Sequence, residues 1–521
     1  MISQVKYLVT KNKFVCYNLY MNKISNTTNN FTLNFKKYFL NKFKIIFLSV
    51  FILFGMINFS YAAYDIDLKL NSSGLSVIEL QNFLINKGYL KTSANGNYGP
   101  ATTKAVKDFQ KKNKIKQTGT FGPSTRAAAK KESKNITNIP TKTTTLTGDT
   151  NSSINLVNFS PEIKNILSKN FTTSAWVPYW RESEGSLEVT TNINKLDIIS
   201  PFSFEMRSDG TFTDPMKLDT GAYADMIKIA KANGKIIVPS ILWWAIGTER
   251  DNLDNVLRDD ELRASLIFDI RNTVKKFELD GIDIDFENKK AESRVPFNKF
   301  LTGLSKDLHK DGKLLVCTIE ARTPLDSKYA NLSADAYQKK LNEVDYSNDF
   351  KTIGNVCDQV RIMAYDQQDD DKQLNNIRQE NNTAYKPVAD IDWVEKVLTL
   401  AMRDIEWKKI IVGVPTYGNK YEITRDLNGK VSNYRKIGSM NWYYADQEAK
   451  NKNLSQIRDA SGELSYTYVE TLATTTKEYY VVYSDAEAIA QKINIARLYK
   501  IGGIAIFKVD GNNDKNIWSK I

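Results

Sequence analysis

From residue 171 onward, short apolar runs that predict strands alternate with stretches in which apolar residues recur at helical spacing. The helical pattern is clearest at 222–232 and 262–277. Eight strands separated by helices favour a (β/α)8 TIM barrel of the α/β class, whose active site lies at the carboxyl ends of the strands. The eight predicted strands are 174–179, 198–204, 236–242, 281–286, 314–319, 359–364, 410–415 and 503–507.

The barrel segment, residues 171–521, is about 100 residues longer than the ~250 that a barrel usually takes. The largest surplus lies between Pro415 and Gly503, where the pattern predicts two more strands, at 464–469 and 479–483, and a helix at 485–499. We therefore expect a small α+β insertion at about 419–484, before the last strand.

Residues 63–131 predict a separate unit of three helices. Apolar residues recur at helical spacing within 76–87, and NGNYGPATTKA at 95–105 is echoed 23 residues later by TGTFGPSTRAA at 118–128, as in a short internal duplication. The segment resembles the peptidoglycan-binding type 1 domain, which implies a wall anchor without catalytic activity. A helical spacer that binds nothing is the alternative. The matching residues are Leu80, Gln81, Leu84, Gly88, Tyr89, Leu90, Gly96, Tyr98, Gly99, Thr102, Ala105, Val106, Phe109, Gln110, Gly119, Phe121, Gly122 and Thr125.

Residues 1–62 have the composition of an export leader. Residues 1–44 contain eight lysines and no acidic residue, residues 45–60 are apolar and uncharged, and Ser60 and Ala62 suit a cleavage site. We expect either a signal peptide, with Met1 or Met21 as the start, or an uncleaved anchor, and a membrane contact only in the second case. Residues 132–170, rich in Ser, Thr and Asn, predict a flexible linker.

The net charge of +12 is unevenly distributed. The leader carries +8, residues 63–131 carry +8 and the linker +1, which leaves the barrel segment at −5. Together with the export leader, this distribution argues against a nucleic-acid partner and favours a mildly acidic enzyme on a basic module.

Histidine and cysteine are scarce. The only histidine, His309, lies in a polar helical run where a solvated position is expected, so His-based catalysis and zinc sites built on several histidines are excluded. Cys317 and Cys357 are the cysteines outside the leader; they either pair or remain as two buried thiols. Carboxylates are therefore the expected catalytic groups.

The run DGIDIDFE at 280–287 carries the strongest chemical signal. Side chains alternate along a strand, so Asp283, Asp285 and Glu287 share one face, which points into the barrel. Mutual repulsion and burial raise the pKa of at least one of them, as suits a general acid, and Glu287 lies at the active mouth. The alternatives are a solvated strand end, or a magnesium or calcium site with these three acids as ligands, against which the other strand ends offer no companion acids beyond Glu320 and Asp366.

The run also matches the DGxDxDxE signature of family 18 glycoside hydrolases, the chitinase-like barrels. MAYD at 363–366 resembles the M-x-Y-D motif of that family, while VGVPTYG at 412–418 and the segment 484–508 are most similar to its bacterial spore-cortex and wall-lytic branch. This resemblance spans the whole barrel segment.

The resemblance implies retaining catalysis assisted by the substrate's own acetamido group, with no metal or cofactor. In that mechanism Glu287 is the acid and base, Asp285 holds the acetamido N–H, Asp283 shares a proton with Asp285, and Tyr365 donates to the acetamido oxygen. Arg361 shares the inward face and could pair with a core acid. The family usually has Trp where Phe507 stands. The candidate substrate-binding residues, from the strand ends and the M-x-Y-D motif, are Asp366, Met363, Trp180, Tyr417, Phe507 and Trp243; Trp176, Tyr179 and Trp244 are further aromatic residues near strand ends.

The expected function is therefore an exported, monomeric glycosidase that cuts β-1,4 bonds after N-acetylglucosamine in peptidoglycan. A chitinase or another N-acetylhexosaminidase anchored to the wall is the alternative. A silent sugar-binding barrel is a further alternative, although the four implied catalytic residues are all retained.

Overall fold

The computed structural model describes residues 68–133, 159–329 and 346–521, apart from 71, 73–74, 92–97, 216, 380–381 and 473–474, with a few further residues between 330 and 345. The leader and most of the linker, with the predictions made for them, lie outside these residues. The chain divides into two compact units, residues 1–139 and 140–521. Among the described residues, no helix is both long and apolar enough to cross a bilayer.

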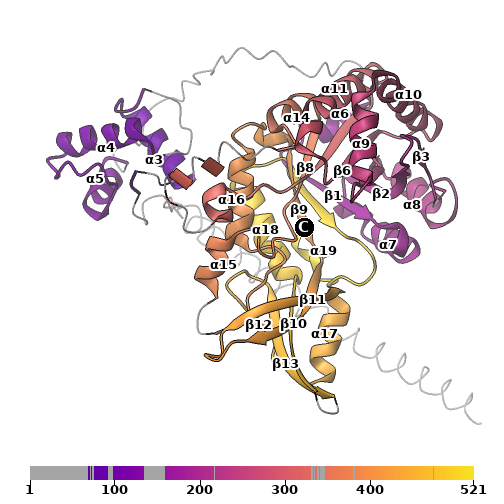
Figure 1. The fold of residues 1–521 in the computed structure, drawn as a ribbon. Coiled ribbons are helices and arrows are strands. Elements are labelled where there is room, and N and C mark those ends of the chain that lie inside the picture. Colours follow the sequence, from indigo (N-terminus) through magenta and orange to yellow (C-terminus); the bar gives the residue numbers. More distant parts are fainter. Residues whose placement is uncertain are drawn as a thin grey trace, which may run out of the picture. The chain divides into compact units, whose positions relative to one another are not determined.

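The first unit contains three helices, α3 (Leu75–Asn86), α4 (Pro100–Lys112) and α5 (Pro123–Ser133), as predicted (Figure 1). The duplication recurs in its hydrogen bonds. The Gln81 amide donates to the Thr102 hydroxyl, and the Gln110 amide donates to the Thr125 hydroxyl, each over 2.9 Å. Its core consists of Leu68, Val77, Leu80, Phe83, Leu84, Leu90, Tyr98, Ala105, Val106, Phe109, Phe121 and Ala129.

The second unit is a closed barrel of eight parallel strands, so the predicted fold class is confirmed. Strand pairing runs β1-β15-β9-β8-β7-β6-β5-β2 and closes through β1 and β2. All eight predicted strands are present, the third one split into two short pieces, β4 and β5. The strands are β1 (Thr172–Val177), β2 (Ile198–Met206), β4 (Ile236–Ile237), β5 (Ser240–Trp244), β6 (Gly281–Glu287), β7 (Leu314–Glu320), β8 (Gln359–Met363), β9 (Ile410–Pro415) and β15 (Gly503–Phe507), and the short β3 (Phe212–Thr213) pairs antiparallel with the end of β2.

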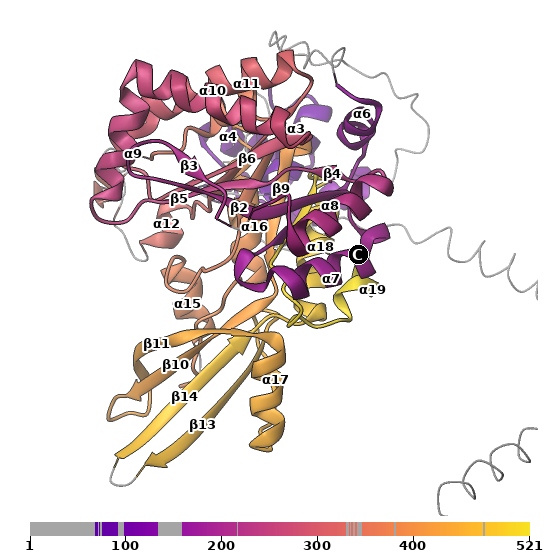
Figure 2. The same cartoon turned by 90° about the vertical axis from the view of Figure 1, so that its right-hand side faces the viewer.

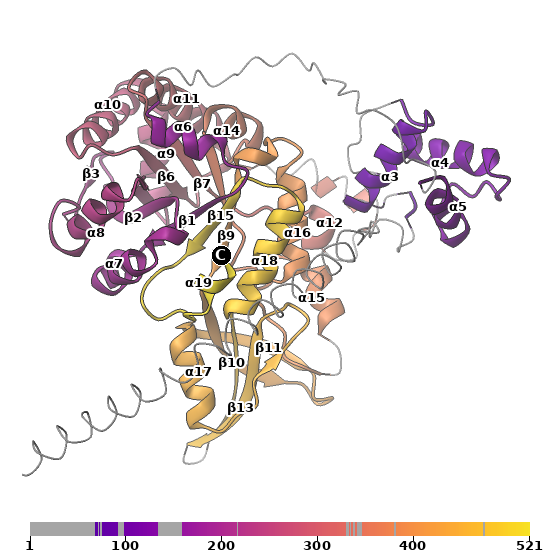
Figure 3. The same cartoon turned by 180° about the vertical axis from the view of Figure 1, so that it is seen from behind.

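Helices surround this barrel, and Figure 3 shows α18 running beside α16 along its outside. The predicted helices at 222–232 and 262–277 correspond to α8 and α10. The helices are α7 (Glu182–Thr191), α8 (Gly221–Ala232), α9 (Glu249–Arg258), α10 (Asp260–Lys276), α11 (Arg294–Lys310), α12 (Leu325–Lys328), α14 (Phe350–Val356), α15 (Lys372–Arg378), α16 (Ile391–Ala401), α18 (Ala486–Leu498) and α19 (Ile517–Lys520).

The end of the expected linker belongs to the barrel unit instead. Helix α6 (Pro161–Ser168), capped by the Ser160 hydroxyl, buries Ile163 and Ile166 against the amino ends of barrel strands, in a cluster with Ile198 and Leu314. Three apolar residues at helical spacing, Ile163, Ile166 and Leu167, were too weak a signal in a short polar run to separate α6 from the linker.

The insertion is a five-stranded antiparallel sheet with one helix. Figure 2 shows α17 (Trp442–Asn451) lying along the sheet, where Ala445 and Ala449 pack against the buried Tyr466 and Tyr483. This confirms the predicted α+β insertion and adds a long hairpin that the sequence pattern did not reveal. The strands are β10 (Tyr417–Arg425), β11 (Val431–Asn441), β12 (Ile457–Arg458), β13 (Leu464–Leu472) and β14 (Thr475–Tyr483).

Two scarce residue types meet on neighbouring elements of the barrel. Cys317 of β7 forms a disulfide with Cys357, just before β8, so the first of the two alternatives for the cysteines, that they pair, is confirmed.

The expectation of a solvated His309 is wrong in part: its Nε2 lies 3.0 Å from Oδ2 of the buried Asp358, and its ring packs edge-on against Phe159. The histidine therefore serves packing at the barrel's outer layer.

Candidate active site

Strand β6 places its three acids on the inner face of the barrel, as the alternation of DGIDIDFE predicts. The opposite face is apolar: Phe286 is fully buried and stacks on Phe300 of α11 at 5.6 Å. Strand β6 is held in place by pairing with β5 on one side and β7 on the other. Its three acids therefore lie at successive depths, with Asp283 deepest, Asp285 in the middle and Glu287 at the carboxyl end of the barrel.

Asp283 is the deepest of the three acids and is surrounded by donors. The Thr318 hydroxyl donates to its Oδ1, and the Ser240 hydroxyl, at 2.7 Å, donates to its Oδ2. The Trp176 indole N–H and the Arg361 guanidinium also donate to Oδ2, each over 3.1 Å. Four strands thus supply one hydrogen-bond donor each, and the Asp283 carboxylate accepts all four hydrogen bonds. The prediction that Arg361 pairs with a core acid is confirmed.

Asp285, the middle acid, is in a different environment. It is buried, and its Oδ1 has no hydrogen-bond partner. Burial raises the pKa of Asp285 well above its ordinary value, and the charges of Glu287 and Asp283 raise it further.

Glu287 ends β6 at the mouth of the barrel and is partly exposed. Burial raises the pKa of its carboxyl to about 7, with further increases from Glu320 and Asp366 and an opposing effect from Lys289. A carboxyl that titrates near neutral pH can give up a proton and take one back under ordinary conditions.

Tyr365 follows β8 and completes this group. Its ring stacks on Phe507 with centroids 5.1 Å apart, and burial together with the charges of Asp285 and Glu287 raises the pKa of its hydroxyl well above 10. The hydroxyl therefore remains a hydrogen-bond donor at physiological pH.

Phe507 is the centre of an aromatic cluster at the mouth. Its ring makes edge contacts with Trp176, Phe202 and Tyr417 at 5.8–6.0 Å. Trp180 is 49% exposed and stacks on Phe202, which extends the cluster outward. The structure thus brings together the sequence candidates Phe507, Tyr417 and Trp180. Phe202 is a further member of the cluster that was not among the sequence candidates. Its position two residues after the inward-facing Ser200 on β2 is the signal that could have indicated it, because residues two apart on a strand share a face.

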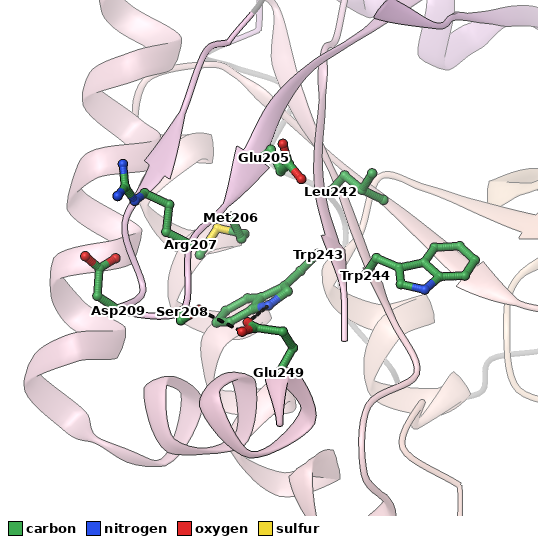
Figure 4. A pocket seen from close by; sticks show the side chains of 9 residues that line it. All are labelled: Glu205, Met206, Arg207, Ser208, Asp209, Leu242, Trp243, Trp244 and Glu249. Carbon is green, nitrogen blue, oxygen red and sulfur yellow. Dashed lines mark hydrogen bonds between the residues drawn. The ribbon is translucent and has the colours of Figure 1, made fainter. Parts of the chain in front are cut away.

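The two tryptophans of β5 point in opposite directions (Figure 4). Trp243 is 2% exposed, packs edge-on against Phe286 and donates its indole N–H to Glu249. Trp244 is 55% exposed and lies in register with Glu287. The register of β5 places Trp243, selected from the sequence as a sugar contact, on the outer face of the barrel, and it places Trp244 on the inner face at the mouth.

Trp244 also borders a cavity of about 460 Å³ between the ends of β2 and β5. Its other lining residues, drawn in Figure 4, are Glu205, Met206, Arg207, Ser208, Asp209, Leu242, Trp243 and Glu249.

The remaining motif residues lie at the rim. Asp366 is exposed, in the left-handed region with φ 56°, and its charge raises the pKa of both Glu287 and Tyr417. Met363 is partly exposed, in register with Glu320. For the metal alternative, the described part of the chain contains no group of three or more His, Cys, Asp or Glu side chains that could hold an ion.

A (β/α)8 barrel with this row of inward acids, one of them titrating near neutral pH beside exposed aromatic rings, has the features of a glycoside hydrolase. The chain belongs to family 18 of the glycosyl hydrolases, whose sequence model matches residues 175–512. Residues 73–129 match the model of a peptidoglycan binding domain.

Among curated proteins, the chain is 24% identical over 247 residues to the uncharacterized glycosylase YvbX of Bacillus subtilis, an alignment that covers 47% of this chain and 62% of that protein. Among solved structures, the spore cortex-lytic enzyme SleL of Bacillus cereus is similar with a TM-score of 0.52 and 21% identity, over 67% of this chain and 73% of that one. A chitinase from Chromobacterium violaceum is similar with a TM-score of 0.53 and 18% identity, over 67% and 97%. At these identities the structural likeness shows the fold alone.

Proposed function

We propose that this chain is an exported, retaining glycosidase that cleaves β-1,4 bonds after N-acetylglucosamine in peptidoglycan, with the substrate's acetamido oxygen as nucleophile. The observation that carries the proposal is the contrast between the two aspartates. Asp283 is occupied by four donors, whereas Asp285 is buried with a free Oδ1 between Asp283 and Glu287. That arrangement suits a group that receives an N–H from the substrate.

Glu287 performs the proton transfers. In the first step it donates its proton to the glycosidic oxygen while the bond from that oxygen to the anomeric carbon breaks, and the acetamido carbonyl oxygen bonds to the same carbon. In the second step the Glu287 carboxylate takes a proton from water, whose oxygen opens the oxazolinium ring with net retention. A carboxyl with a pKa of about 7 fits both roles.

Asp285 and Tyr365 orient the acetamido group. Tyr365 donates its hydroxyl to the carbonyl oxygen, and Asp285 accepts the N–H. As positive charge develops on the oxazolinium, it stabilises the anionic form of Asp285, whose proton stays within the pair with Asp283. A carboxyl that burial keeps neutral thus becomes charged when the transition state forms.

The wall polymer is supported by the first unit and by one relative. Residues 73–129 match a peptidoglycan binding domain, and the similar protein SleL is a spore cortex-lytic enzyme. A module with a net charge of +8 is also suited to anionic wall polymers.

Export is supported by the composition of the leader and, independently, by the bond between Cys317 and Cys357. Disulfides persist in oxidising compartments outside the cytoplasm. Sequencing the amino terminus of the protein recovered from the culture medium or wall fraction tests export and locates the cleavage site.

The decisive experiment digests purified peptidoglycan and chitin in parallel with wild type and Glu287→Gln. New reducing ends of N-acetylglucosamine from peptidoglycan, absent with the variant, support the proposal. New reducing ends of N-acetylmuramic acid would refute it, because the acetamido group of N-acetylglucosamine would then lie on the wrong side of the broken bond. Efficient cleavage of chitin with none of peptidoglycan would identify a chitinase instead.

A further inference from the structure

Glu320, at the end of β7, lies beside the end of β6 and is tied to the residue that follows the acid. Its Oε1 accepts the backbone N–H of Asn288 over 2.8 Å, and its Oε2 accepts the side-chain amide of Asn348. Asn288 adopts the left-handed conformation, with φ 58°, which Asn tolerates better than most residues. In this conformation its backbone N–H donates to Glu320. The Glu320 carboxylate is thus held at a defined place next to Glu287.

Lys289, the next residue in the same loop, supplies the opposite charge. Its side chain is fully buried, its ammonium group donates to the backbone carbonyl of Phe286, and it lies over the Phe297 ring at 4.7 Å. Its Nζ is 3.8 Å from Oε2 of Glu320. A buried ammonium group is costly without a partner, and Glu320 is the carboxylate that compensates it.

The two charges act on Glu287 in opposite directions. Burial alone would raise the pKa of Glu320, but Lys289 and the hydrogen bonds from Asn288 and Asn348 bring it below its ordinary value. The resulting anion raises the pKa of Glu287, whereas Lys289 lowers it. Within the described residues, the other titratable groups that act on Glu287 or are acted on by it are Asp285 below it on β6, and Tyr365 and Asp366 after β8.

We propose that Glu320 and Lys289 are positioning residues that set the pH range over which Glu287 works as the acid, an inference that rests on the proposed function of Glu287. Glu320 keeps the proton on Glu287 in the free enzyme, and Lys289 limits how tightly that proton is held. Their balance lets one carboxyl serve as an acid in the first step and as a base in the second.

The test compares pH profiles of kcat/KM on soluble N-acetylglucosamine oligomers. The alkaline limb reports loss of the proton from the acid in the free enzyme. Glu320→Gln preserves an acceptor for the Asn288 N–H but removes the charge, so the alkaline limb should move to lower pH by about one unit. Lys289→Met preserves the apolar stem over Phe297 and should move the limb to higher pH.

The double variant should return the limb close to its wild-type position, and Glu292→Gln, at an exposed site on the same loop, should leave it unchanged. Opposite shifts in the two single variants support the proposal, since a merely structural role would not reverse the sign. Shifts in the same direction, or none larger than that of Glu292→Gln, overturn it.

A second measurement separates this inference from the proposed function. Carbon-13 NMR of glutamate-labelled protein follows the titration of the Glu287 carboxyl without turnover, with its signal assigned by its loss in Glu287→Gln. Midpoints that move as above in a protein that cleaves neither polymer support the ion pair and refute the proposed chemistry. Midpoints that stay constant in an active enzyme refute the ion-pair inference alone.

Discussion

Arg361 and Asp283 form an ion pair in the interior of the barrel, with 3.1 Å between Nη1 and Oδ2 and with both side chains 0% exposed. The same Nη1 donates to the Ser200 hydroxyl over 2.8 Å, and the guanidinium lies 5.0 Å from the Trp176 ring. The pair lies directly below Asp285 on the inner face of β6. It therefore supports the floor of the site and fixes the charge that Asp285 faces.

Arg361→Met should lower the free energy of unfolding by about 3–5 kcal/mol, because it leaves a buried carboxylate without its counter-ion. Chemical denaturation of both forms measures the difference. Asp283→Asn added to Arg361→Met should restore part of the loss, since the remaining neutral donors can satisfy an amide oxygen. A double variant no more stable than Arg361→Met would show that the unpaired charge is not the cause.

The two neighbouring tryptophans of β5 should respond differently to truncation. Trp244→Ala should change the free energy of unfolding by less than about 0.5 kcal/mol, as for most surface positions, and should raise KM for glycan oligomers through loss of a stacking surface. Trp243→Ala should cost about 3–5 kcal/mol, because it empties a packed site against Phe286. Thermal unfolding and oligomer kinetics on both variants test the assignment, which fails if Trp243→Ala alone changes KM.

The difference between these two tryptophans illustrates what the sequence could and could not reveal. Strict alternation in DGIDIDFE was enough to predict that three acids point inward. The alternate residues are all apolar, and this apolar face must pack against the surrounding helices. The third barrel strand is interrupted between β4 and β5, and its pairing with β2 shifts register between Phe202 and Phe204, so the phase at Trp243 could not be counted from the pattern.

Hydrogen-bond and ion-pair partners that come from distant segments of the chain could not be predicted from the sequence either. The four donors to Asp283 come from β1, β5, β7 and β8, and only their positions around the closed barrel reveal that they share one acceptor. Glu320 and Lys289 were visible as charged residues, but the ion pair between them depends on a turn at Asn288 that no pattern in the sequence encodes.

In the first unit, Gln110→Leu should unfold or loosen the module while leaving the barrel intact. The Gln110 amide donates to the Thr120 carbonyl and accepts the Gly119 N–H, both over 2.8–2.9 Å, and each group left without a partner costs about 1–3 kcal/mol. Amide hydrogen exchange in α4 and α5 of the full chain should accelerate, and sedimentation with purified walls should fall.

The exposed Gln117→Leu is the matched control, and hydrolysis of soluble oligomers by the barrel is the internal reference. Equal exchange rates in the two variants would contradict a structural role for the Gln110 network. Lost wall binding with unchanged exchange would instead indicate that Gln110 contacts the polymer.

The disulfide should contribute to the stability of the barrel. Replacing Cys317 and Cys357 together by Ala should lower the free energy of unfolding by about 2–4 kcal/mol, because the bond closes a loop across 40 positions of the chain. Unfolding with and without reductant measures the effect. A reductant that destabilises wild type but not the double variant confirms the source, and equal effects on both would exclude it.

The last prediction concerns stability against pH at Glu287. The pKa of its carboxyl is about 7 in the folded protein against an ordinary value of 4.5, so between these pH values the folded protein binds a proton that the unfolded chain has released. Stability contributed by this proton is complete below pH 4.5 and is lost as the pH rises through 7, at a cost of at most about 3 kcal/mol.

Glu287→Gln removes the titration. Relative to wild type, the variant should therefore gain stability between pH 4.5 and pH 8 while losing activity on glycans, and Glu292→Gln should show neither effect. Denaturation curves at both pH values measure the change, and a stability difference between Glu287→Gln and wild type that is constant across this range would refute the perturbed acid on which the proposed mechanism depends.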